Sequence, residues 1–212
     1  MVKFVIIRHG YSLGNKEKRF TGQLDVPLDE VGYAQANATA KYVVENFKID
    51  KIYSSDLRRA YDTAKPIAEA LGLPINVEKS LREADVGIWA GRLISEVEKE
   101  FPERFAFYKT SPGLSHVEGG ESYAELSARA CATFERIAAE NDGKTVAVTT
   151  HGGVIRTLFA AWNGISLEQI GGLLHFPNAS VTVAEYDCGK VKFLQEGYDG
   201  HLAVRTVWAG DN

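Results

Sequence analysis

Four residues able to hold and attack a phosphate group follow strand-like segments of this sequence. Arg8 and His9 come directly after a run of apolar residues, Arg58 follows a second such segment, and His151 follows a third. Parallel strands bring their carboxyl ends to one edge of a sheet, where ligands bind. Arginine pairs with phosphate oxygens, and a neutral imidazole can attack phosphorus to form a phosphohistidine. We therefore predict a phosphate-transfer site at this edge, with His9 as the nucleophile.

This chemistry needs a neutral nucleophile, charge neutralisation and an acid for the leaving alkoxide. The cations expected around His9 disfavour its protonated form and so lower its pKa. Phosphoryl transfer depends mainly on positioning and on neutralising charge, so fixed arginines can replace a metal ion, and no metal or other cofactor is expected. Glu83 lies in a loop between expected elements and is the best-placed general acid.

Strand-like and helix-like segments alternate along most of the chain. This alternation predicts an α/β fold, a three-layer sandwich in which helices flank a mostly parallel central sheet. Asp29 is a good N-cap for one helix, and Gly72 is placed to end another. Strands are expected at residues 4–7, 51–53, 75–77, 145–150, 180–186 and 190–195, and helices at 29–47, 57–71, 154–162 and from the capping boxes at 95–98 and 122–125.

The domain organisation is expected to be simple, because the sequence has no repeats, low-complexity segments or obvious linkers. We predict one domain spanning residues 1–212, with a helical and loop insertion at about residues 92–121 that covers the active site. A strand near residues 181–183 could form an exposed edge and pair with a second copy. Monomer and homodimer therefore both stay open.

The composition is that of an ordinary globular protein of 212 residues, with 45% hydrophobic and 25% charged residues. The net charge of −4 argues against a broad nucleic-acid surface, which needs clustered Lys and Arg. The first apolar run is short and interrupted by Arg8, unlike a signal peptide, and no stretch approaches the length of a membrane span. A cytoplasmic location without nucleic-acid or membrane partners is expected. Cys131 and Cys188 lack metal-site spacing and are interpreted as buried structural thiols.

Six motifs carry a resemblance to a known family. The segment RHGYSLGN at residues 8–15 resembles the signature of the histidine phosphatase superfamily, which includes the cofactor-dependent phosphoglycerate mutases. The resemblance covers nearly the whole chain and implies a phosphoglycerate mutase-like fold. The other five motifs follow in the family's order at residues 21–28, 54–64, 81–91, 120–122 and 151–156.

The resemblance also implies a role for each residue of the site. His9 would be the phosphorylated nucleophile, and Glu83 would protonate the leaving group and later activate water. Tyr11 and Ala90 replace acidic residues common in the family, which bears on specificity more than on mechanism. The phosphate pocket would contain Arg8, Asn15, Thr21, Gly22, Arg58, His151 and Gly152.

Two activities of this family share such a site, and a non-catalytic alternative also stays open. The mutases carry basic residues, which hold the phosphoglycerate carboxylate, where this chain has Ala84, Asp85 and Ile94. They also carry a longer insertion before residues 120–122. We therefore favour a phosphatase that hydrolyses small-molecule phosphomonoesters over a mutase. A phosphate-binding module without turnover would be expected to lose His9, an arginine or the acid, and all are present.

Other candidate residues have simpler structural interpretations. Trp89 and Tyr123 are interpreted as packing residues rather than ligand contacts. His175 and His201 belong to no constellation in the sequence, and His116 lies in a loop that could line a substrate entrance. The substrate is expected to be a small phosphorylated metabolite, and the sequence does not identify which one.

Overall fold

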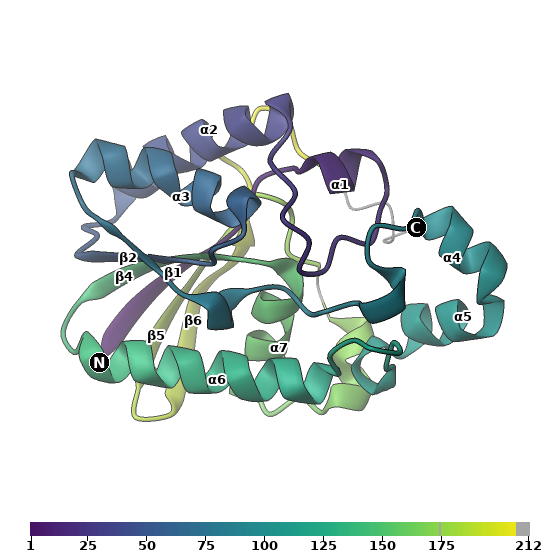
Figure 1. Cartoon of the computed structure of the whole chain (residues 1–212). Helices are drawn as coiled ribbons and strands as arrows, with labels where there is room; N and C mark the ends of the chain where they lie inside the picture. Colours follow the sequence, from purple (N-terminus) through teal and green to yellow (C-terminus); the bar gives the residue numbers. More distant parts are fainter. Residues whose placement is uncertain (174, 207–212) are drawn as a thin grey trace.

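The computed structural model describes residues 1–173 and 175–206, in which six strands form one sheet (Figure 1). The order is β3-β2-β4-β1-β5-β6, with β3, β2, β4 and β1 parallel and β5 and β6 antiparallel to their neighbours. The expected domain of residues 1–212 includes residue 174 and residues 207–212, which lie outside the described residues. The strands are β1 (Val2–Arg8), β2 (Lys51–Ser54), β3 (Ile75–Val77), β4 (Thr145–Thr150), β5 (Val181–Asp187) and β6 (Lys190–Tyr198).

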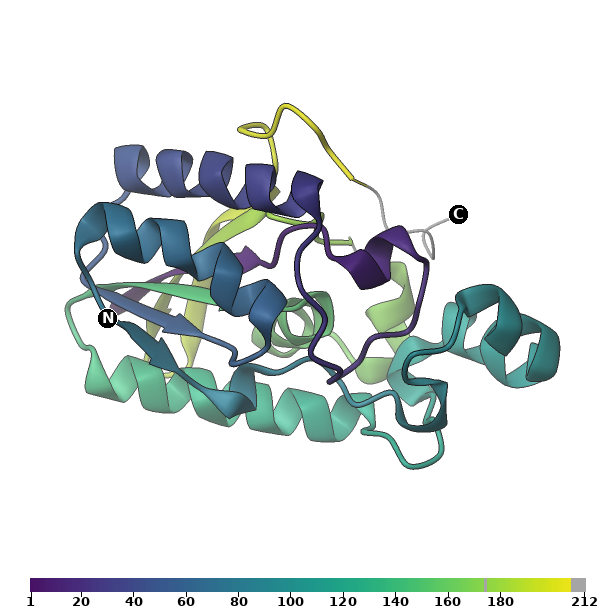
Figure 2. The same cartoon turned by 45° about the horizontal axis from the view of Figure 1, so that its top comes forward.

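Helices cover both faces of the sheet and make a three-layer α/β sandwich, as predicted. In Figures 1 and 2, α2 and α3 lie over one face, and α6 and α7 lie over the other. The helices are α1 (Leu13–Lys16), α2 (Glu30–Asn46), α3 (Arg58–Leu71), α4 (Ile94–Glu100), α5 (Pro102–Thr110), α6 (Tyr123–Glu140) and α7 (Gly152–Trp162). Short 3-10 helices are η1 (Lys79–Leu81), η2 (Gly87–Trp89), η3 (Pro112–Leu114) and η4 (Leu167–Gly172).

The central strand β1 shows why both faces must be covered. Alternate side chains of a strand point to opposite faces. Phe4 and Ile6 pack in the core beneath α6 and α7, whereas Val5 and Ile7 pack in the core beneath α2 and α3. All four are almost completely buried, so an uninterrupted apolar run is what this position in the sheet requires.

The helix boundaries follow from local side-chain chemistry where the predictions are confirmed. The Asp29 carboxylate accepts the backbone N–H of Gly32 at 2.8 Å and begins α2. Gly72 ends α3 in the left-handed region, with φ of 65°, which glycine adopts without a steric penalty. The capping box at Ser122 begins α6.

Three structural predictions are wrong. The helix expected to start at Ser95 starts at Ile94, because the Glu96 carboxylate accepts the N–H of Leu93 at 2.9 Å and caps the earlier turn. The strand expected at an exposed edge, β5, lies between β1 and β6, so the sheet edges are β3 and β6. Cys131 is half-buried as a structural thiol can be, but Cys188 is exposed in the turn between β5 and β6.

Helices α4 and α5 project beyond the carboxyl end of the parallel strands, at the right of Figure 1. Both helices contribute to a separate small apolar cluster, which also contains Trp89 of η2; this side chain is 2% exposed and packs as predicted. The buried members of the cluster are Phe20, Val86, Trp89, Val97, Phe105 and Val117. This cluster packs the residues 94–110 against the loop that follows α1, on one side of the pocket described next.

Candidate active site

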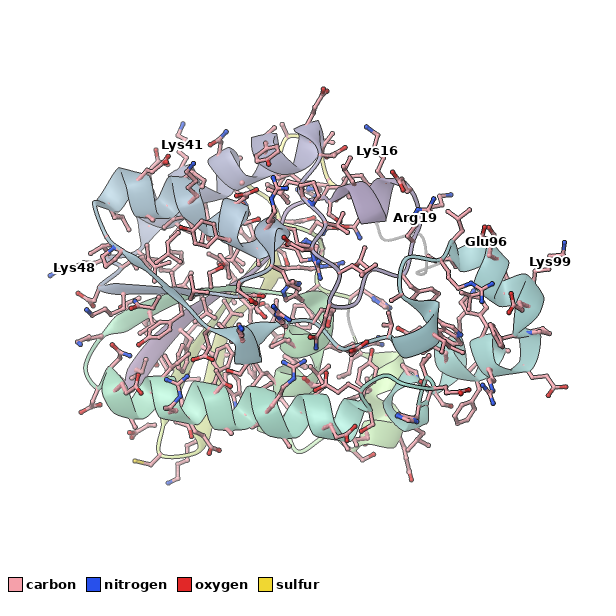
Figure 3. The ribbon with its side chains drawn as sticks, viewed as in Figure 1. Lys16, Arg19, Lys41, Lys48, Glu96 and Lys99 are labelled. Carbon is pink, nitrogen blue, oxygen red and sulfur yellow. The ribbon has the colours of Figure 1, made fainter. Side chains whose placement is uncertain are left out.

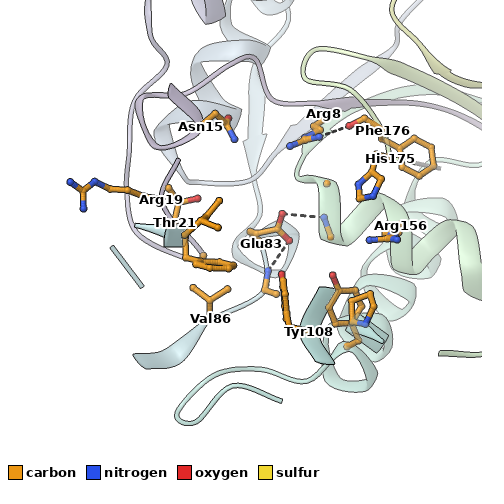
Figure 4. A pocket seen from close by; sticks show the side chains of 18 of the residues that line it. Arg8, Asn15, Arg19, Thr21, Glu83, Val86, Tyr108, Arg156, His175 and Phe176 are labelled. Atoms are coloured by element: carbon orange, nitrogen blue, oxygen red, sulfur yellow. Dashed lines mark hydrogen bonds between the residues drawn. The ribbon is translucent and has the colours of Figure 1, made fainter. Parts of the chain in front are cut away.

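Two neighbouring parallel strands, β1 and β4, end beside one pocket. Arg8 is the last residue of β1 and His9 follows it, while His151 follows β4 at the start of α7. The imidazole rings of His9 and His151 lie with their centroids 5.1 Å apart. Figure 4 shows the pocket, whose wall includes Arg8, Asn15, Thr21 and Glu83. The sheet edge thus brings together side chains that are as far apart in sequence as residues 8 and 151.

His9 has the orientation and charge that a nucleophile needs. Its Nδ1 lies 2.7 Å from the carbonyl oxygen of Gly10, so Nδ1 carries the proton and Nε2 keeps its lone pair. Burial lowers the pKa of His9 well below its usual range, and the nearby guanidiniums of Arg59 and Arg8 lower it further. The imidazole is therefore neutral at neutral pH, as the sequence predicted, with Nε2 available for attack.

The second arginine of the pocket is Arg59, and the prediction of Arg58 is wrong. Arg58 is exposed at the first position of α3, and its backbone N–H donates to the carboxylate of Asp25. Arg59 is 1% exposed, lines the pocket and lowers the pKa of His9. Successive helical residues point about 100° apart, so only one of the two adjacent arginines can face the pocket.

The guanidinium of Arg59 is held rigidly by backbone carbonyls. It donates to the oxygen of Gly22 at 2.7 Å and to that of Leu24 at 2.9 Å. Burial lowers the pKa of Arg59 to about 10, against the opposing effect of the Glu83 carboxylate, so it remains a cation at neutral pH. The sequence contained a pattern that favours Arg59 over Arg58 as the buried arginine. Arg59, Thr63 and Ile67 are each four residues apart and therefore share the buried face of α3.

The other predicted phosphate-side residues line the same pocket. Arg8 donates from its guanidinium to the carbonyl oxygen of Phe176, which holds it beside the pocket (Figure 4). Asn15 lines the pocket and also completes the capping box that begins α1. Thr21 and Gly22 line it from the loop after α1. Arg59 holds this loop by donating a hydrogen bond to the carbonyl oxygen of Gly22.

His151 lies behind His9 rather than on the pocket wall. It is fully buried, and its Nε2 is 2.9 Å from the hydroxyl oxygen of Ser55. Its Nδ1 has no hydrogen-bond partner among the described residues. Burial, with the charge of Arg59 and its neighbour His9, lowers the pKa of His151 well below the usual range. Gly152, the next residue, does line the pocket.

Glu83 is placed at the amino end of α7. Its carboxylate accepts the backbone N–H of Ala84 at 2.9 Å and that of Gly153 at 3.1 Å, and dashed lines mark both contacts in Figure 4. The partial positive charge of a helix amino end favours a carboxylate there. Glu83 therefore faces the pocket from a defined position, as expected of a residue that exchanges protons with a bound ester.

Several pocket residues besides Arg59 were not predicted from the sequence. Tyr123 was interpreted as a packing residue, and His175 was assigned to no constellation, yet both line the pocket. Tyr108 from α5 and Arg156 from α7 line it too. Arg156 had a readable signal, since it lies three residues after Gly153 and therefore on the same face of the helix. The tyrosines carried no such signal, because they come from the beginning of one helix and the end of another.

Two broader findings apply to the part of the chain that the structure describes. No helix there combines the length and the apolar character needed to cross a membrane. In the same residues, no three side chains of His, Cys, Asp or Glu are grouped so that they could hold a metal ion.

The fold and the site together define a class of protein. A neutral histidine at a strand end, two arginines beside it and a carboxylate across the pocket are the parts of a phosphoryl-transfer enzyme that works through the histidine. The second arginine is Arg59, and all these groups line one pocket beside the carboxyl ends of β1 and β4.

Comparison with known proteins identifies the family. The description "Histidine phosphatase superfamily (branch 1)" matches residues 4–197. Phosphoserine phosphatase 1 of Hydrogenobacter thermophilus is 36% identical over 99% of this chain and 98% of its own length. A metal-independent phosphoserine phosphatase of Arabidopsis thaliana is 34% identical, over 94% of this chain and 89% of its own.

Comparison with solved structures supports the same family. A mycobacterial glucosyl-3-phosphoglycerate phosphatase superimposes with a TM-score of 0.85 at 31% identity, over 93% of this chain and 99% of the other. The chain therefore belongs to the histidine phosphatase superfamily, branch 1. It is a phosphomonoester hydrolase of that superfamily with the phosphoglycerate mutase-like fold.

Proposed function

We propose that this protein hydrolyses small-molecule phosphomonoesters through a covalent phosphohistidine on His9, without a metal ion. The observation that carries the proposal is the state of His9: Nδ1 is held by the Gly10 carbonyl, and burial, together with the charges of Arg59 and Arg8, lowers the pKa of the ring so that it is neutral. The same two guanidiniums supply positive charge where the phosphoryl oxygens would lie, which is the role that a metal ion has in many other phosphotransferases.

In the first step, Nε2 of His9 attacks phosphorus and forms the N–P bond while the ester P–O bond breaks. The carboxylic acid of Glu83 gives its proton to the leaving oxygen, so the alcohol departs neutral. In the second step, the Glu83 carboxylate takes a proton from water, which attacks phosphorus and releases inorganic phosphate. The N–P bond breaks, and the neutral imidazole of His9 is regenerated.

Candidate substrates come from the substrates for which the similar proteins are named. Phosphoserine is the first to test, because two relatives that match this chain over most of its length are named for it. Glucosyl-3-phosphoglycerate is the second, from the mycobacterial phosphatase. We take both as examples of one class, phosphomonoesters of small alcohols.

The test is hydrolysis of p-nitrophenyl phosphate and of phosphoserine in excess chelator, with the wild-type protein compared with His9→Ala. We expect turnover to survive the chelator and to fall by at least about 10³-fold in the variant, because the nucleophile is lost. A rapid acid-free quench should trap an acid-labile phosphoenzyme in wild type and none in the variant. His116→Ala is the matched control, since His116 is exposed, lies outside the pocket lining, and its ring contacts the carbonyl oxygen of Gly120.

Loss of activity in chelator that is restored by a divalent ion would contradict the metal-independent mechanism. Turnover that persists in His9→Ala would contradict the covalent intermediate. Conversion of one phosphoglycerate isomer into the other, without release of inorganic phosphate, would replace the hydrolase proposal by mutase activity.

A further inference from the structure

The part of the pocket away from His9 contains a buried cation that the reaction itself does not use. Arg156 lies on α7 and lines the pocket, but it is only 9% exposed. Its guanidinium donates to the carbonyl oxygen of Gly171 at 3.0 Å, and its Nε has no partner within the described residues. No carboxylate of that part of the chain forms an ion pair with it. A buried guanidinium without a counter-charge is costly, so this position is suited to an anion that arrives with the substrate.

Arg156 belongs to the side of the pocket where the leaving group must lie. The charges that act on His9 are those of Arg59 and Arg8, whereas Arg156 acts on Tyr108 and Tyr123 together with Glu83. Figure 4 agrees, with Arg8 and Asn15 at the upper part of the pocket and Tyr108 and Arg156 lower, near Glu83. Arg156 and the proton donor for the leaving group thus both lie below Arg8 in this view (Figure 4).

Two tyrosines complete the polar wall around this guanidinium. Tyr108 and Tyr123 line the same pocket as Arg156, and the charge of Arg156 acts on both phenols. Burial raises the pKa of both phenols, that of Tyr108 well above its usual range, and the nearby Glu83 carboxylate adds to the effect. Both groups therefore remain neutral hydroxyls that can donate a hydrogen bond.

The spacing of Gly153 and Arg156 along α7 places Glu83 and the guanidinium of Arg156 at the same side of this helix. The backbone N–H of Gly153 holds the Glu83 carboxylate at 3.1 Å, and Arg156 is three residues further along the same helix. That separation is about 4.5 Å along the axis and keeps both residues on one face. A small leaving group whose ester oxygen meets Glu83 can therefore present an anionic group to the same face of α7, where Arg156 lies.

We propose that Arg156, with the hydroxyls of Tyr108 and Tyr123, forms a binding site for a carboxylate on the leaving group. The preferred substrates are then phosphomonoesters of small hydroxycarboxylic acids. This inference rests on the proposed phosphatase function and adds its substrate class. A carboxylate fits because it is planar, carries one charge against one unpaired cation, and accepts several hydrogen bonds in the geometry that guanidinium offers.

The test compares two esters that differ only in the carboxylate, 3-phosphoglycerate and glycerol 3-phosphate. For the wild type we expect kcat/KM to be about 10- to 100-fold higher for 3-phosphoglycerate, the range that a charged hydrogen-bonded contact provides. In Arg156→Gln this ratio should fall to within about 3-fold of one. Tyr123→Phe should lower it by less, because only one hydroxyl is removed, and Arg156→Lys should restore part of it.

Arg19→Gln is the control for general charge. Arg19 also lines the pocket, but its side chain is 39% exposed and pairs with Glu17. Figure 3 places Arg19 near α1 and α4, and Figure 4 shows its guanidinium directed away from Glu83. We expect the substrate ratio to stay near the wild-type value in this variant. An equal fall in Arg19→Gln and Arg156→Gln would overturn the proposal in favour of a diffuse electrostatic effect.

Further outcomes separate this inference from the proposed function. A wild-type ratio near one, or a ratio that Arg156→Gln leaves intact in a protein with wild-type circular dichroism, would overturn the carboxylate site while p-nitrophenyl phosphate is still hydrolysed. Should Arg156→Gln not fold, Tyr123→Phe and Arg156→Lys carry the same test. Failure of His9-dependent hydrolysis of p-nitrophenyl phosphate would instead overturn the phosphatase function itself.

Discussion

Replacing Gly153 by alanine tests the position of Glu83 without altering its chemistry. A Cβ atom at Gly153 would lie 2.2 Å from Oε1 and 3.2 Å from Cδ of Glu83, whereas ordinary contact begins near 3.4 Å. The carboxylate must therefore move by about 1 Å. Because the nearest atom is the end of a flexible side chain, the protein should fold and Glu83 should shift. The backbone N–H that donates to Glu83 at 3.1 Å is kept in alanine.

The expected loss depends on how much the leaving group needs a proton. A misplacement of about 1 Å can cost about 10²-fold in rate, and a general acid contributes about 10²- to 10⁴-fold. For an alkyl ester such as glycerol 3-phosphate, we expect kcat/KM of Gly153→Ala to fall by about 100-fold. For p-nitrophenyl phosphate we expect a fall below about 10-fold, because the nitrophenolate is a weak base and leaves without protonation.

Steady-state kinetics with both esters is the assay, since kcat/KM reports only the steps through release of the alcohol. Glu83→Gln should show the same difference between the substrates. Gly172→Ala is the matched control, because its Cβ would meet nothing within 4 Å and Gly172 has no left-handed φ. An equal loss on both esters would refute the assignment of Glu83 as the acid, and so would unchanged turnover of the alkyl ester in Gly153→Ala.

Three further predictions follow from contacts in the site. Arg59→Met should lower kcat/KM for p-nitrophenyl phosphate by at least about 100-fold, whereas the neighbouring Arg58→Met should change it by less than about 3-fold; equal effects would contradict the assignment of the second arginine. Ser55→Ala removes the hydrogen bond to His151 and should lower kcat/KM by about 10-fold, with Ser55→Thr restoring much of it; an unchanged rate would mean that this hydrogen bond does not position the ring. Because His9 and His151 have a pKa well below 6.5 when folded, the unfolded chain binds protons first as the pH falls. The free energy of unfolding should therefore drop below about pH 6.5, by up to about 1.4 kcal/mol per pH unit for each histidine. Urea unfolding from pH 7 to pH 5 measures this slope, which should be smaller in His9→Asn; an identical slope would show that this histidine does not titrate as argued.

Local patterns predicted the fold because they act over a few residues. The apolar run before Arg8 requires cover on both faces of a strand, and Asp29 and Gly72 mark helix ends through their own backbone chemistry. The alternation of such elements leaves few ways to build a sheet. The predicted boundary at Ser95 is misplaced because the Glu96 carboxylate accepts the backbone N–H of Leu93, two residues earlier, and so caps the helix there.

The sequence by itself determined the element order, the α/β class and the residues that β1 and β4 deliver to the sheet edge, His9 and His151 among them. These follow from short-range patterning and from the position of a residue directly after a strand. The helical spacing of Arg59 with Thr63 and Ile67 marks one face of α3 as buried, but the tertiary structure decided that this face lies against the pocket, because packing sets the rotation of α3 about its axis. It also brought Tyr108 and Arg156 together from helices that no local pattern connects. Contacts between distant segments depend on how whole elements pack, so only the folded chain defines the end of the pocket that selects the substrate.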